Sequence, residues 1–300
     1  MRFHADSLTV APVLRQMCVA QSHTQARAGA EVSMSSGARR TSWRRITQYF
    51  QGASVGEPEA IPNVSTEELR AILGGISTAT LTHQLQMRGI RSTFLSGLRP
   101  LNPQLRMVGR ARTLRYVPLR EDLQRTYGGG VNAQRRAVEG MSAGDVLVIE
   151  ARGVPDAGTI GDIFAMRAFT LGAAGIITDG ALRDSPAIAH LGKPVYHQAS
   201  HGSTFGRMHM PFSNDECITC AGVFVVPGDV VVGDGEGAVI IPAALVAEVA
   251  RDAQAQEEVE AFAIERVAAG EPTNDLFPLA AARRPQFEAW AAERKRNSDT

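Results

Sequence analysis

The sequence predicts an α/β fold, and the strongest evidence lies in residues 144–184. Residues 146–149 form a continuous apolar run, which is typical of a strand that is buried on both faces. Residues 161–171 carry apolar side chains at helical spacing, and residues 176–178 form a second apolar run. A strand, a helix and a second strand in this order predict a parallel pair joined by a right-handed crossover.

Two helices, a strand and a third helix are predicted before this unit. Ser65 and Glu68 have the spacing of a capping box, which marks the start of the first helix. Residues 78–88 are predicted to form the second helix, which ends at a glycine. β-branched and aromatic residues indicate a strand at 108–116, and residues 132–139 are predicted to form a short helix.

Short strands and two helices are predicted after the unit. Turns rich in Gly, Pro and Asp separate the strands, and the long helix that follows begins with Pro242 and ends at Gly270. The final helix is polar, and Pro285 is a point where it could break. The predicted strands are 195–196, 222–226, 230–232 and 238–241, and the helices are 242–270 and 279–296.

The composition of the 300 residues argues against binding through bulk charge. There are 31 Lys and Arg residues against 31 Asp and Glu residues, so the net charge is zero. We therefore expect no nucleic-acid partner and no membrane partner. Three cysteines are too few for a disulfide framework, which favours a reducing, cytoplasmic location. No apolar run reaches the ~18 residues that a membrane-spanning helix needs.

The first 62 residues differ from the rest in composition. They are rich in Arg and Ser and poor in acidic residues, which is typical of an organelle transit peptide. A disordered tail and a start assigned too far upstream are the alternatives. We therefore divide the chain into an N-terminal extension at 1–62, an α/β domain at 63–270 that carries the candidate site, and a helical tail at 271–300.

Polar residues gather where the predicted parallel strands end, which is where ligands of α/β units bind. Gly161 and Asp162 stand at a helix start, whose free amides can bind an anion. After the next strand, Arg183 can hold a carboxylate, and Asp184 offers hard oxygen ligands to Mg²⁺ or Mn²⁺. Asp162 could move a proton across the same crevice.

A purely structural interpretation explains the same residues. Asp162 would stabilise the first turn of its helix through the helix dipole. Arg183 and Asp184 would form a solvated turn with a local ion pair. Position alone does not separate this interpretation from a functional one.

The spacing of these residues favours the functional interpretation. Twenty residues separate Asp162 from the dipeptide Arg183-Asp184. This pattern resembles the signature of the class II pyruvate aldolases, which are typified by 4-hydroxy-4-methyl-2-oxoglutarate/4-carboxy-4-hydroxy-2-oxoadipate aldolase. These enzymes share a fold with the regulator of ribonuclease activity A (RraA) proteins. Residues 172–180 and 227–242 are also similar to the family, so the resemblance spans the region between the N-terminal extension and the tail.

The resemblance implies a role for each residue of the crevice. Asp184 would bind a divalent metal, Mg²⁺ or Mn²⁺, and Arg183 would contact the substrate and steady its enolate. Asp162 would hold a metal-bound water. The implied reaction is cleavage of 4-hydroxy-2-oxo acids to pyruvate, with decarboxylation of oxaloacetate by the same enolate chemistry. The backbone amides that would bind the pyruvyl carboxylate are those of Gly161, Asp162, Ile163 and Phe164.

The resemblance also implies an architecture and an assembly. The fold would be a three-layer, swivelling-type α/β domain with helical N- and C-terminal elements. It would assemble into a homotrimer or a homohexamer with the sites between subunits. An acidic residue from the neighbouring subunit would complete each site, and Glu257 and Glu260 on the long helix are the two candidates.

Two further observations bear on the function. Lys193 and Lys295 are the only lysines, and Lys193 precedes a proline, so an aldolase that uses a Schiff-base lysine has poor candidates. The competing hypothesis is a noncatalytic RraA-like regulator that binds RNA-decay proteins. Such regulators generally lack the acid of the Arg-Asp pair, whereas Asp184 supplies it here.

A second motif offers a weaker candidate site. Cys217 and Cys220 form a C-x-x-C pair, and His197, His201 and His209 lie nearby in the sequence. This pattern allows a zinc site, but a second ligand pair at regular spacing is missing. We favour small apolar thiols at the entry to a strand.

Overall fold

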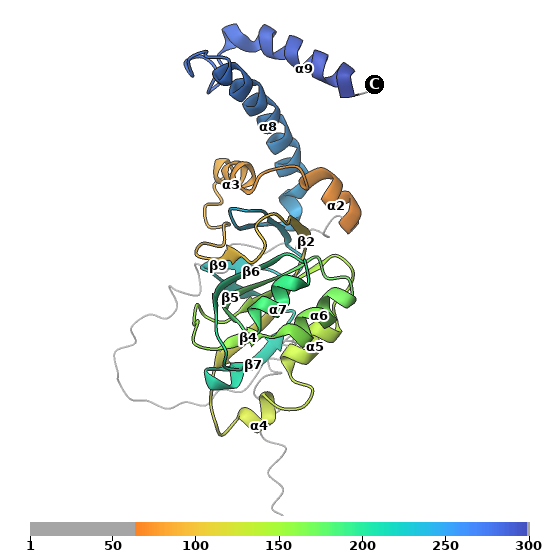
Figure 1. The fold of residues 1–300 in the computed structure, drawn as a ribbon, viewed down its shortest axis with the longest axis vertical. Coiled ribbons are helices and arrows are strands. Elements are labelled where there is room, and N and C mark those ends of the chain that lie inside the picture. Colours follow the sequence, from red (N-terminus) through yellow and green to blue (C-terminus); the bar gives the residue numbers. More distant parts are fainter. Residues whose placement is uncertain (1–63, 299–300) are drawn as a thin grey trace, which may run out of the picture. The chain divides into compact units, whose positions relative to one another are not determined.

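The structure is a computed structural model that describes residues 64–298. The predicted N-terminal extension at 1–62 lies outside the described residues. The described part has the predicted α/β class, with helices packed around a mixed, curled sheet (Figure 1).

The main sheet contains nine strands of the described part. Its path runs β1-β6-β5-β3-β2-β10-β11, with β4 added to β5 and β7 added to β2. The pairs among β2, β3, β5 and β6 are parallel, as is β4 on β5, whereas β1, β7, β10 and β11 pair antiparallel. A separate hairpin pairs β8 with β9. The strands are β1 Arg99–Pro100, β2 Met107–Pro118, β3 Asp145–Glu150, β4 Gly158–Ile160, β5 Gly175–Leu182, β6 Val195–Ser200, β7 His209–Asn214, β8 Ile218–Cys220, β9 Val223–Val225, β10 Val230–Gly233 and β11 Ala238–Ile241.

The predicted helices form close to their expected bounds. Ser65 and Glu68 make the predicted capping box. A short 3₁₀ turn, Ala243–Leu245, precedes the long helix. The final helix begins at Arg284, so Pro285 lies in its first turn and does not break it. The α-helices are α2 Thr66–Leu73, α3 Thr78–Met87, α4 Gln124–Tyr127, α5 Ala133–Glu139, α6 Asp162–Thr170, α7 Ser185–His190, α8 Val246–Ala268 and α9 Arg284–Ser298.

The predicted parallel pair, β3 and β5, lies in the core of the sheet. Leu147 and Ile149 of β3 belong to the apolar cluster that contains residues of α5, α6 and α7. Val146 and Val148 belong to a second cluster, which contains residues of β8 and β9. Because successive side chains of a strand point to opposite faces, this run has to be apolar at every position.

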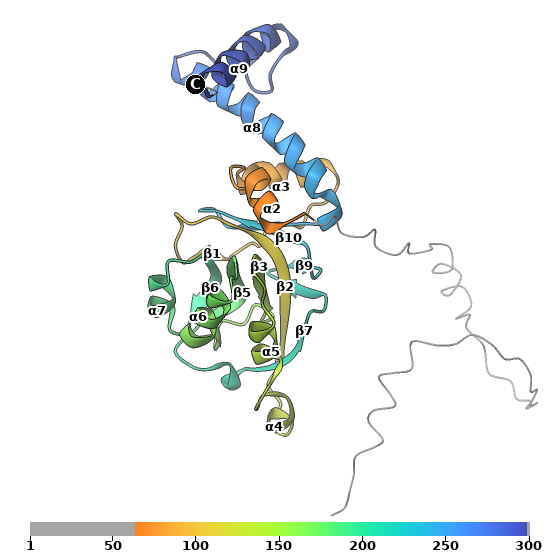
Figure 2. The same ribbon diagram turned by 90° about the vertical axis from the view of Figure 1, so that its right-hand side faces the viewer.

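Different helices cover different parts of the sheet. α5, α6 and α7 lie together on one side of it (Figure 1). α2, α3 and the first turns of α8 pack on β10 and β11 around a third apolar cluster (Figure 2). Farther along α8, Phe262 packs with Trp290 of α9 and with Leu276 in a small core of their own. No helix within residues 64–298 has both the length and the apolar character needed to cross a membrane.

The second strand of the parallel pair is longer than its apolar run predicts. We expected it to end before Asp179, but β5 continues to Leu182. The Asp179 carboxylate accepts hydrogen bonds from the backbone amides of Ala151, Gly153 and Ala221. Burial raises the pKa of Asp179, and these amides partly offset that effect. Backbone amides from segments distant in the sequence therefore let an acidic residue remain inside a buried strand.

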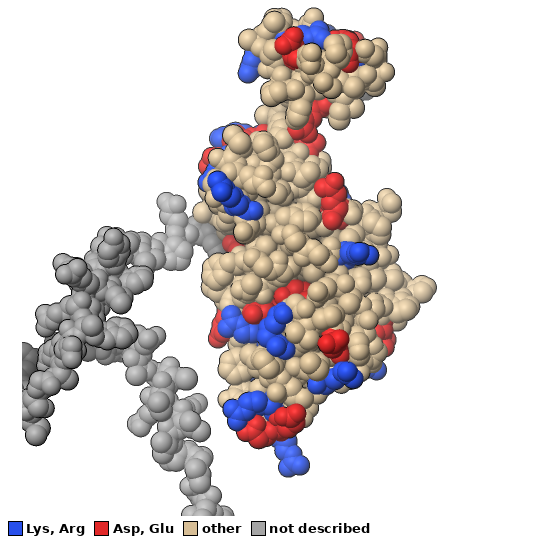
Figure 3. Space-filling model, turned by 90° about the vertical axis from the view of Figure 1, so that its left-hand side faces the viewer, with Lys and Arg blue, Asp and Glu red and all other residues tan. Residues whose placement is uncertain are grey.

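Charges of both signs are interspersed on the face drawn in Figure 3. Small basic and acidic groups alternate there without a broad field of one sign.

Candidate active site

Two loops that follow neighbouring strands meet at the site, as the sequence predicts. β4, a strand that the sequence did not reveal, pairs in parallel with the last residues of β5. The backbone amide of Arg183 donates a hydrogen bond of 3.0 Å to the carbonyl of Ile160. This bond ties the start of α6 to the Arg-Asp dipeptide. Asp162, Arg183 and Asp184 consequently line one pocket.

A buried hydrogen-bond network fixes β4 in place. The carbonyl oxygen of Thr159 accepts bonds from the Tyr116 hydroxyl at 2.8 Å and from the Gln134 side-chain amide at 2.7 Å. The Thr159 hydroxyl donates to the carbonyl of Ala181 at 3.0 Å. Burial raises the pKa of Tyr116 far above its ordinary value, so its hydroxyl remains a proton donor. The segment that leads into α6 is therefore held from three sides.

Two glycines allow the loops to approach each other. A β-carbon on Gly158 would lie 2.6 Å from the β-carbon of Arg183, which is too close for any side chain. A β-carbon on Gly161 would lie 3.0 Å from Oδ2 of Asp184. Neither glycine has a positive φ angle; Gly158 is required by the close backbone approach, whereas a side chain at Gly161 would require the Asp184 carboxylate to shift.

The carboxylate of Asp184 makes no capping hydrogen bond to α7, the helix that follows it. The residue has left-handed backbone angles, φ 58° and ψ 34°, and stands at the N-cap of α7 without making a side-chain capping bond. Its Oδ2 lies 3.6 Å from Nε of Arg183, and the two side chains are 34% and 45% exposed. An ion pair this exposed contributes little stability, so both groups are available to a ligand.

The start of α6 presents backbone amides to the same pocket. Oδ1 of Asp162 accepts a hydrogen bond of 2.8 Å from the amide of Ile163. Within residues 64–298, the amides of Asp162 and Phe164 donate to no protein acceptor. The amide of Ile163 is thus already engaged by Asp162, and the Ile163 side chain is 78% exposed, so the structure gives less support to a substrate contact by this residue than to contacts by its neighbours. Free amides at a helix start are a binding site for a carboxylate.

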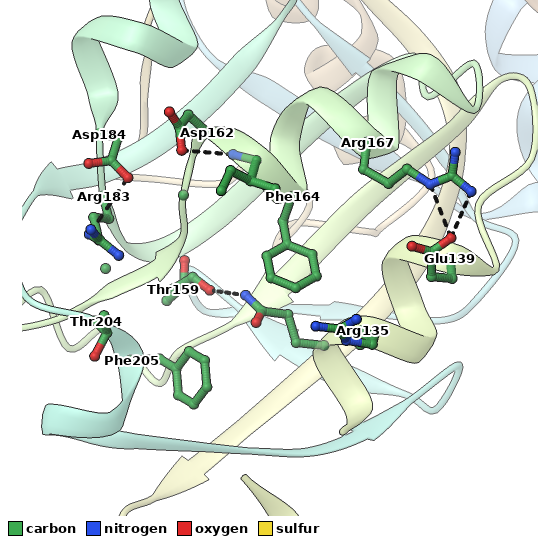
Figure 4. Close-up of a pocket in the computed structure, with 14 residues that line it drawn as sticks. Arg135, Glu139, Thr159, Asp162, Phe164, Arg167, Arg183, Asp184, Thr204 and Phe205 are labelled. Atoms are coloured by element: carbon green, nitrogen blue, oxygen red, sulfur yellow. Dashed lines mark hydrogen bonds and ion pairs between the residues drawn. The ribbon is translucent and has the colours of Figure 1, made fainter. Parts of the chain in front are cut away.

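The pocket extends beyond the predicted residues to a second end. It has a volume of about 490 Å³. Figure 4 shows Asp162, Arg183 and Asp184 on one side of the Phe164 ring and Arg135, Glu139 and Arg167 on the other. The lining residues are Gln134, Arg135, Glu139, Gly158, Thr159, Gly161, Asp162, Ile163, Phe164, Arg167, Arg183, Asp184, Thr204 and Phe205.

The far end contains an ion pair that the sequence did not reveal. Arg167 of α6 donates from Nε and Nη2 to Oε2 of Glu139 on α5, at 3.0 and 2.8 Å. The hydrogen bonds from Arg167 lower the pKa of Glu139. The spacing of Arg135 and Glu139 places them on one face of a helix, but it does not show that this face meets α6.

Comparison with known proteins identifies the family. Residues 78–240, which are more than half of the chain, match the RraA-like family model described as Aldolase/RraA. The chain belongs to the RraA-like family. The curled α/β sheet is the fold of its solved relatives as well.

Relatives of this RraA-like chain carry different names. A protein of Halalkalibacterium halodurans, provisionally named 4-hydroxy-4-methyl-2-oxoglutarate aldolase, is 34% identical over 177 residues, which cover 56% of this chain and 77% of the relative. RraAS2 of Streptomyces coelicolor, described as an unusual member of the RNase ES inhibitor RraA protein family, has 33% identity and a TM-score of 0.61, with 68% of this chain and 98% of that chain covered. An uncharacterized Pseudomonas syringae protein has 25% identity and a TM-score of 0.61, with 70% and 96% covered.

The donor set of this RraA-like site suits a hard cation with few protein ligands. Asp184 and Asp162 supply carboxylate oxygens, and the missing side chain of Gly161 leaves space beside Asp184. Residues 64–298 contain no group of three or more His, Cys, Asp and Glu residues that could hold a metal. A metal at Asp184 would therefore take its other ligands from water, from the substrate or from another subunit.

The two acids proposed to serve a neighbouring subunit are engaged within this chain. Oε1 of Glu257 accepts a bond of 3.0 Å from the amide of Ser77 at the start of α3. Oε1 of Glu260 accepts a bond of 2.7 Å from the side chain of Gln256. A role for either acid in a neighbouring site stays a prediction, and it would need these bonds to be exchanged.

The C-x-x-C pair does not gather metal ligands in the described part of the chain. Cys217 is exposed and Cys220 is buried, with its thiol donating to the carbonyl of Ile149 at 3.7 Å. Burial raises the pKa of Cys220 well above its ordinary value, which disfavours the thiolate that zinc requires. These observations fit the interpretation of a small apolar thiol in a strand.

Proposed function

We propose that this RraA-like protein is a divalent-metal-dependent aldolase that cleaves 4-hydroxy-2-oxo acids to pyruvate. The observation that carries the proposal is the placement of Arg183 and Asp184 beside Asp162 and the open amides of α6 in one pocket. This set offers a cation ligand, a fixed positive charge, a proton carrier and a carboxylate-binding helix start. The provisional aldolase name of the Halalkalibacterium halodurans relative supports the same conclusion.

Asp184 is the residue that would hold the metal, because its carboxylate faces the pocket and caps no helix. Mg²⁺ and Mn²⁺ match its hard oxygen atoms. A divalent cation bound there acts as a Lewis acid that polarises the 2-oxo group of the substrate. Asp162 adds a second carboxylate to this end of the pocket, which raises its attraction for a cation.

The protein groups would bind the pyruvyl half of the substrate. The amides of Asp162 and Phe164 would accept the C1 carboxylate at the start of α6. Arg183 would donate to the 2-oxo oxygen, where negative charge develops as the enolate forms. The Gly158 contact and the hydrogen bond from the Arg183 amide to the Ile160 carbonyl fix the backbone from which the Arg183 side chain extends toward the pocket.

Cleavage then requires one proton to leave the substrate and one to return. Asp162 would take the proton of the C4 hydroxyl as the bond between C3 and C4 breaks. The bonding electrons move into the enolate of pyruvate, and a new carbonyl forms at C4. Protonation of the enolate at C3 completes pyruvate. Oxaloacetate would reach the same enolate by losing CO₂.

A second candidate function has one observation in its favour. The chain is 33% identical to RraAS2, which is described within a family of ribonuclease inhibitors, and the match covers 98% of that protein. This RraA-like chain could therefore act as a noncatalytic regulator of RNA-decay proteins. The acid at position 184 favours the aldolase, because a binding surface has no need of a cation ligand inside a pocket.

The test is a substrate panel for the full chain. Purified protein is assayed for pyruvate release from several 4-hydroxy-2-oxo acids and from oxaloacetate, with Mg²⁺, with Mn²⁺ and with a chelator. We expect metal-dependent release that Asp184→Ala abolishes. Asp156→Ala is the matched control, because Asp156 is exposed and lies outside the pocket. Release of pyruvate from none of the substrates by folded protein would overturn the proposal and leave the regulator as the better explanation.

A further inference from the structure

We infer that residues 119–131, which contain α4, form a lid that closes over the pocket when the pyruvyl half of the substrate binds. The inference rests on the proposed function and adds a conformational step to it. In this structure the lid is open, and a contact between Tyr127 and Phe212 holds it in that position.

The proposed chemistry favours a cover for the pocket, because its charged groups are open to water. The side chains of Arg183 and Asp184 are 45% and 34% exposed. A fixed charge stabilises an enolate far better in a site without water, since water screens the charge. Closure of a loop over the bound substrate removes that water in many enzymes. An element beside the mouth of the pocket that is free to move is therefore a candidate for this task.

The lid joins two elements that line the pocket. Its first residue, Leu119, donates a backbone hydrogen bond of 3.1 Å to the carbonyl of Met208, which follows the 3₁₀ turn Phe205–Arg207. The first residue of that turn lines the pocket. The last residue of the lid precedes the N-cap of α5, and residues 134 and 135 of α5 also line the pocket. Both ends of the lid are therefore anchored at the pocket.

The body of the lid is attached weakly to the rest of the molecule. None of residues 119–131, all of which the structure describes, is buried, and none of them lines the pocket. α4 stands apart from the other helices, beyond α5 and β7 (Figures 1 and 2). A segment with no buried residue can change its position at a low cost in free energy.

A hinge follows α4 directly. Gly128, Gly129 and Gly130 stand between α4 and α5, and Gly130 has a φ of 57°, which residues other than glycine rarely adopt. The side-chain amide of Asn132 donates to the carbonyl of Gly128 at 2.9 Å, while its Oδ1 caps α5 by accepting from the amide of Arg135. The cap keeps the base of the hinge in place, and the glycines allow the backbone above it to rotate.

The contact between Tyr127 of α4 and Phe212 of β7 is the latch of the open lid. The centres of the two rings lie 5.5 Å apart, and the ring planes are tilted by 41°. The two residues are 39% and 44% exposed, and neither belongs to an apolar core cluster of the described residues. A surface pair of this kind contributes a modest stabilisation, which the binding of a ligand to the closed state can exceed.

The test uses oxalate as the probe, because oxalate is planar and chelates a divalent cation through two oxygen atoms, as the enolate of pyruvate would. Calorimetry with Mg²⁺ gives the Kd of oxalate for the wild type, Phe212→Ala and Phe224→Ala. Phe224→Ala is the matched control, since Phe224 is an exposed phenylalanine of β9 and lies outside the pocket. Trypsin cleavage after Arg125 of α4, located by mass spectrometry, reports the position of the lid. Cleavage after the exposed Arg296 of α9 is the internal control.

We expect oxalate with Mg²⁺ to slow cleavage after Arg125 at least about fivefold and to leave cleavage after Arg296 unchanged, because cleavage follows the population of the open state. Phe212→Ala should lower the Kd of oxalate about two- to tenfold, since it removes a contact that only the open state makes. Phe224→Ala should bind as the wild type does. General damage by a substitution weakens binding, so tighter binding is specific to the loss of a latch.

The remaining outcomes separate this inference from the proposed function. Oxalate that binds the wild type without slowing cleavage after Arg125 would overturn the lid, while the pyruvyl site stands. Unchanged or weaker oxalate binding by folded Phe212→Ala would overturn the inference as well. Folded wild-type protein that binds oxalate with neither Mg²⁺ nor Mn²⁺ would overturn the proposed site and the lid together.

Discussion

The side chain of Asp184 and the backbone of Gly161 meet so closely that a β-carbon on Gly161 would lie 3.0 Å from Oδ2 of Asp184. The contact joins Asp184, which follows β5, to Gly161, the N-cap residue of α6. It places the proposed cation ligand beside the amides proposed to bind the substrate carboxylate. The position of the Asp184 carboxylate therefore depends on the absence of a side chain at position 161.

The first prediction concerns that contact. Gly161→Ala should lower metal-dependent pyruvate release at least about tenfold, because the new methyl group pushes the Asp184 carboxylate from its position. The backbone of Gly161, at φ −111° and ψ −179°, is extended and suits alanine, so the free energy of unfolding should change by less than about 1 kcal/mol. Urea unfolding and initial rates measure the two effects.

Gly202→Ala is the control for this substitution. A β-carbon on Gly202 would stand in open space, and the residue lies outside the pocket. Activity that survives Gly161→Ala as fully as it survives Gly202→Ala would contradict a role for the close contact.

A second prediction concerns the bond that anchors β4. Tyr116→Phe removes the hydroxyl that donates to the Thr159 carbonyl, while the bond from Gln134 remains. We expect a loss of about 1 kcal/mol in the free energy of unfolding, measured with urea. Tyr127→Phe should have no measurable effect, because Tyr127 is exposed. Equal stabilities of the two variants would show that the buried bond contributes nothing.

Stability at mildly acidic pH should depend on His209. Burial, helped by the charge of Arg152, lowers the pKa of His209 to about 4. The unfolded chain takes up this proton as the pH falls through about 6.5, whereas the folded chain stays neutral to about 4. The contribution is therefore complete above pH 6.5 and is lost as the pH falls toward 4. Between pH 7 and pH 5 the loss should be about 2 kcal/mol.

Urea unfolding at pH 7 and pH 5 checks this expectation. His209→Gln should remove the His209 part of the loss, since glutamine does not titrate and its oxygen can still accept from Arg152, which contacts Nδ1 of His209 at 3.0 Å. A smaller loss should remain from His197, because burial also lowers the pKa of that histidine. The exposed His83 is the control, and His83→Gln should leave the pH dependence as it is in the wild type. A wild-type stability that is the same at both pH values would count against a neutral, buried His209.

The sequence was most informative where local patterns decide the structure. The apolar run at Val146 and the capping box at Ser65 predicted β3 and α2. The position of Asp162, Arg183 and Asp184 beyond the ends of the predicted parallel strands predicted that they share a pocket. The prediction that the second strand ends before Asp179 was wrong, because the Asp179 carboxylate inside the strand accepts hydrogen bonds from amides of distant segments. Such partners depend on tertiary packing, and no local pattern reveals them.

The far end of the pocket escaped prediction for a related reason. Arg135 and Glu139 look like an ordinary solvated pair on a short helix. Only the packing of α6 shows that they line the pocket. α6 places the Phe164 ring against the guanidinium of Arg135 and places Arg167 within hydrogen-bond distance of Glu139. Two helices that are separated by two strands in the sequence, β3 and β4, become walls of one pocket only after the sheet has formed.

The most direct test of an enolate-stabilising metal site uses pyruvate alone. Exchange of the pyruvate methyl protons with D₂O, followed by NMR, reports formation of the same enolate without any knowledge of the other half of the substrate. With Mg²⁺ or Mn²⁺, the wild type should accelerate exchange well above the rate of buffer with metal. A chelator, Asp184→Asn or Arg183→Met should abolish that acceleration. Folded wild-type protein that exchanges pyruvate no faster than buffer with metal would contradict the proposed chemistry.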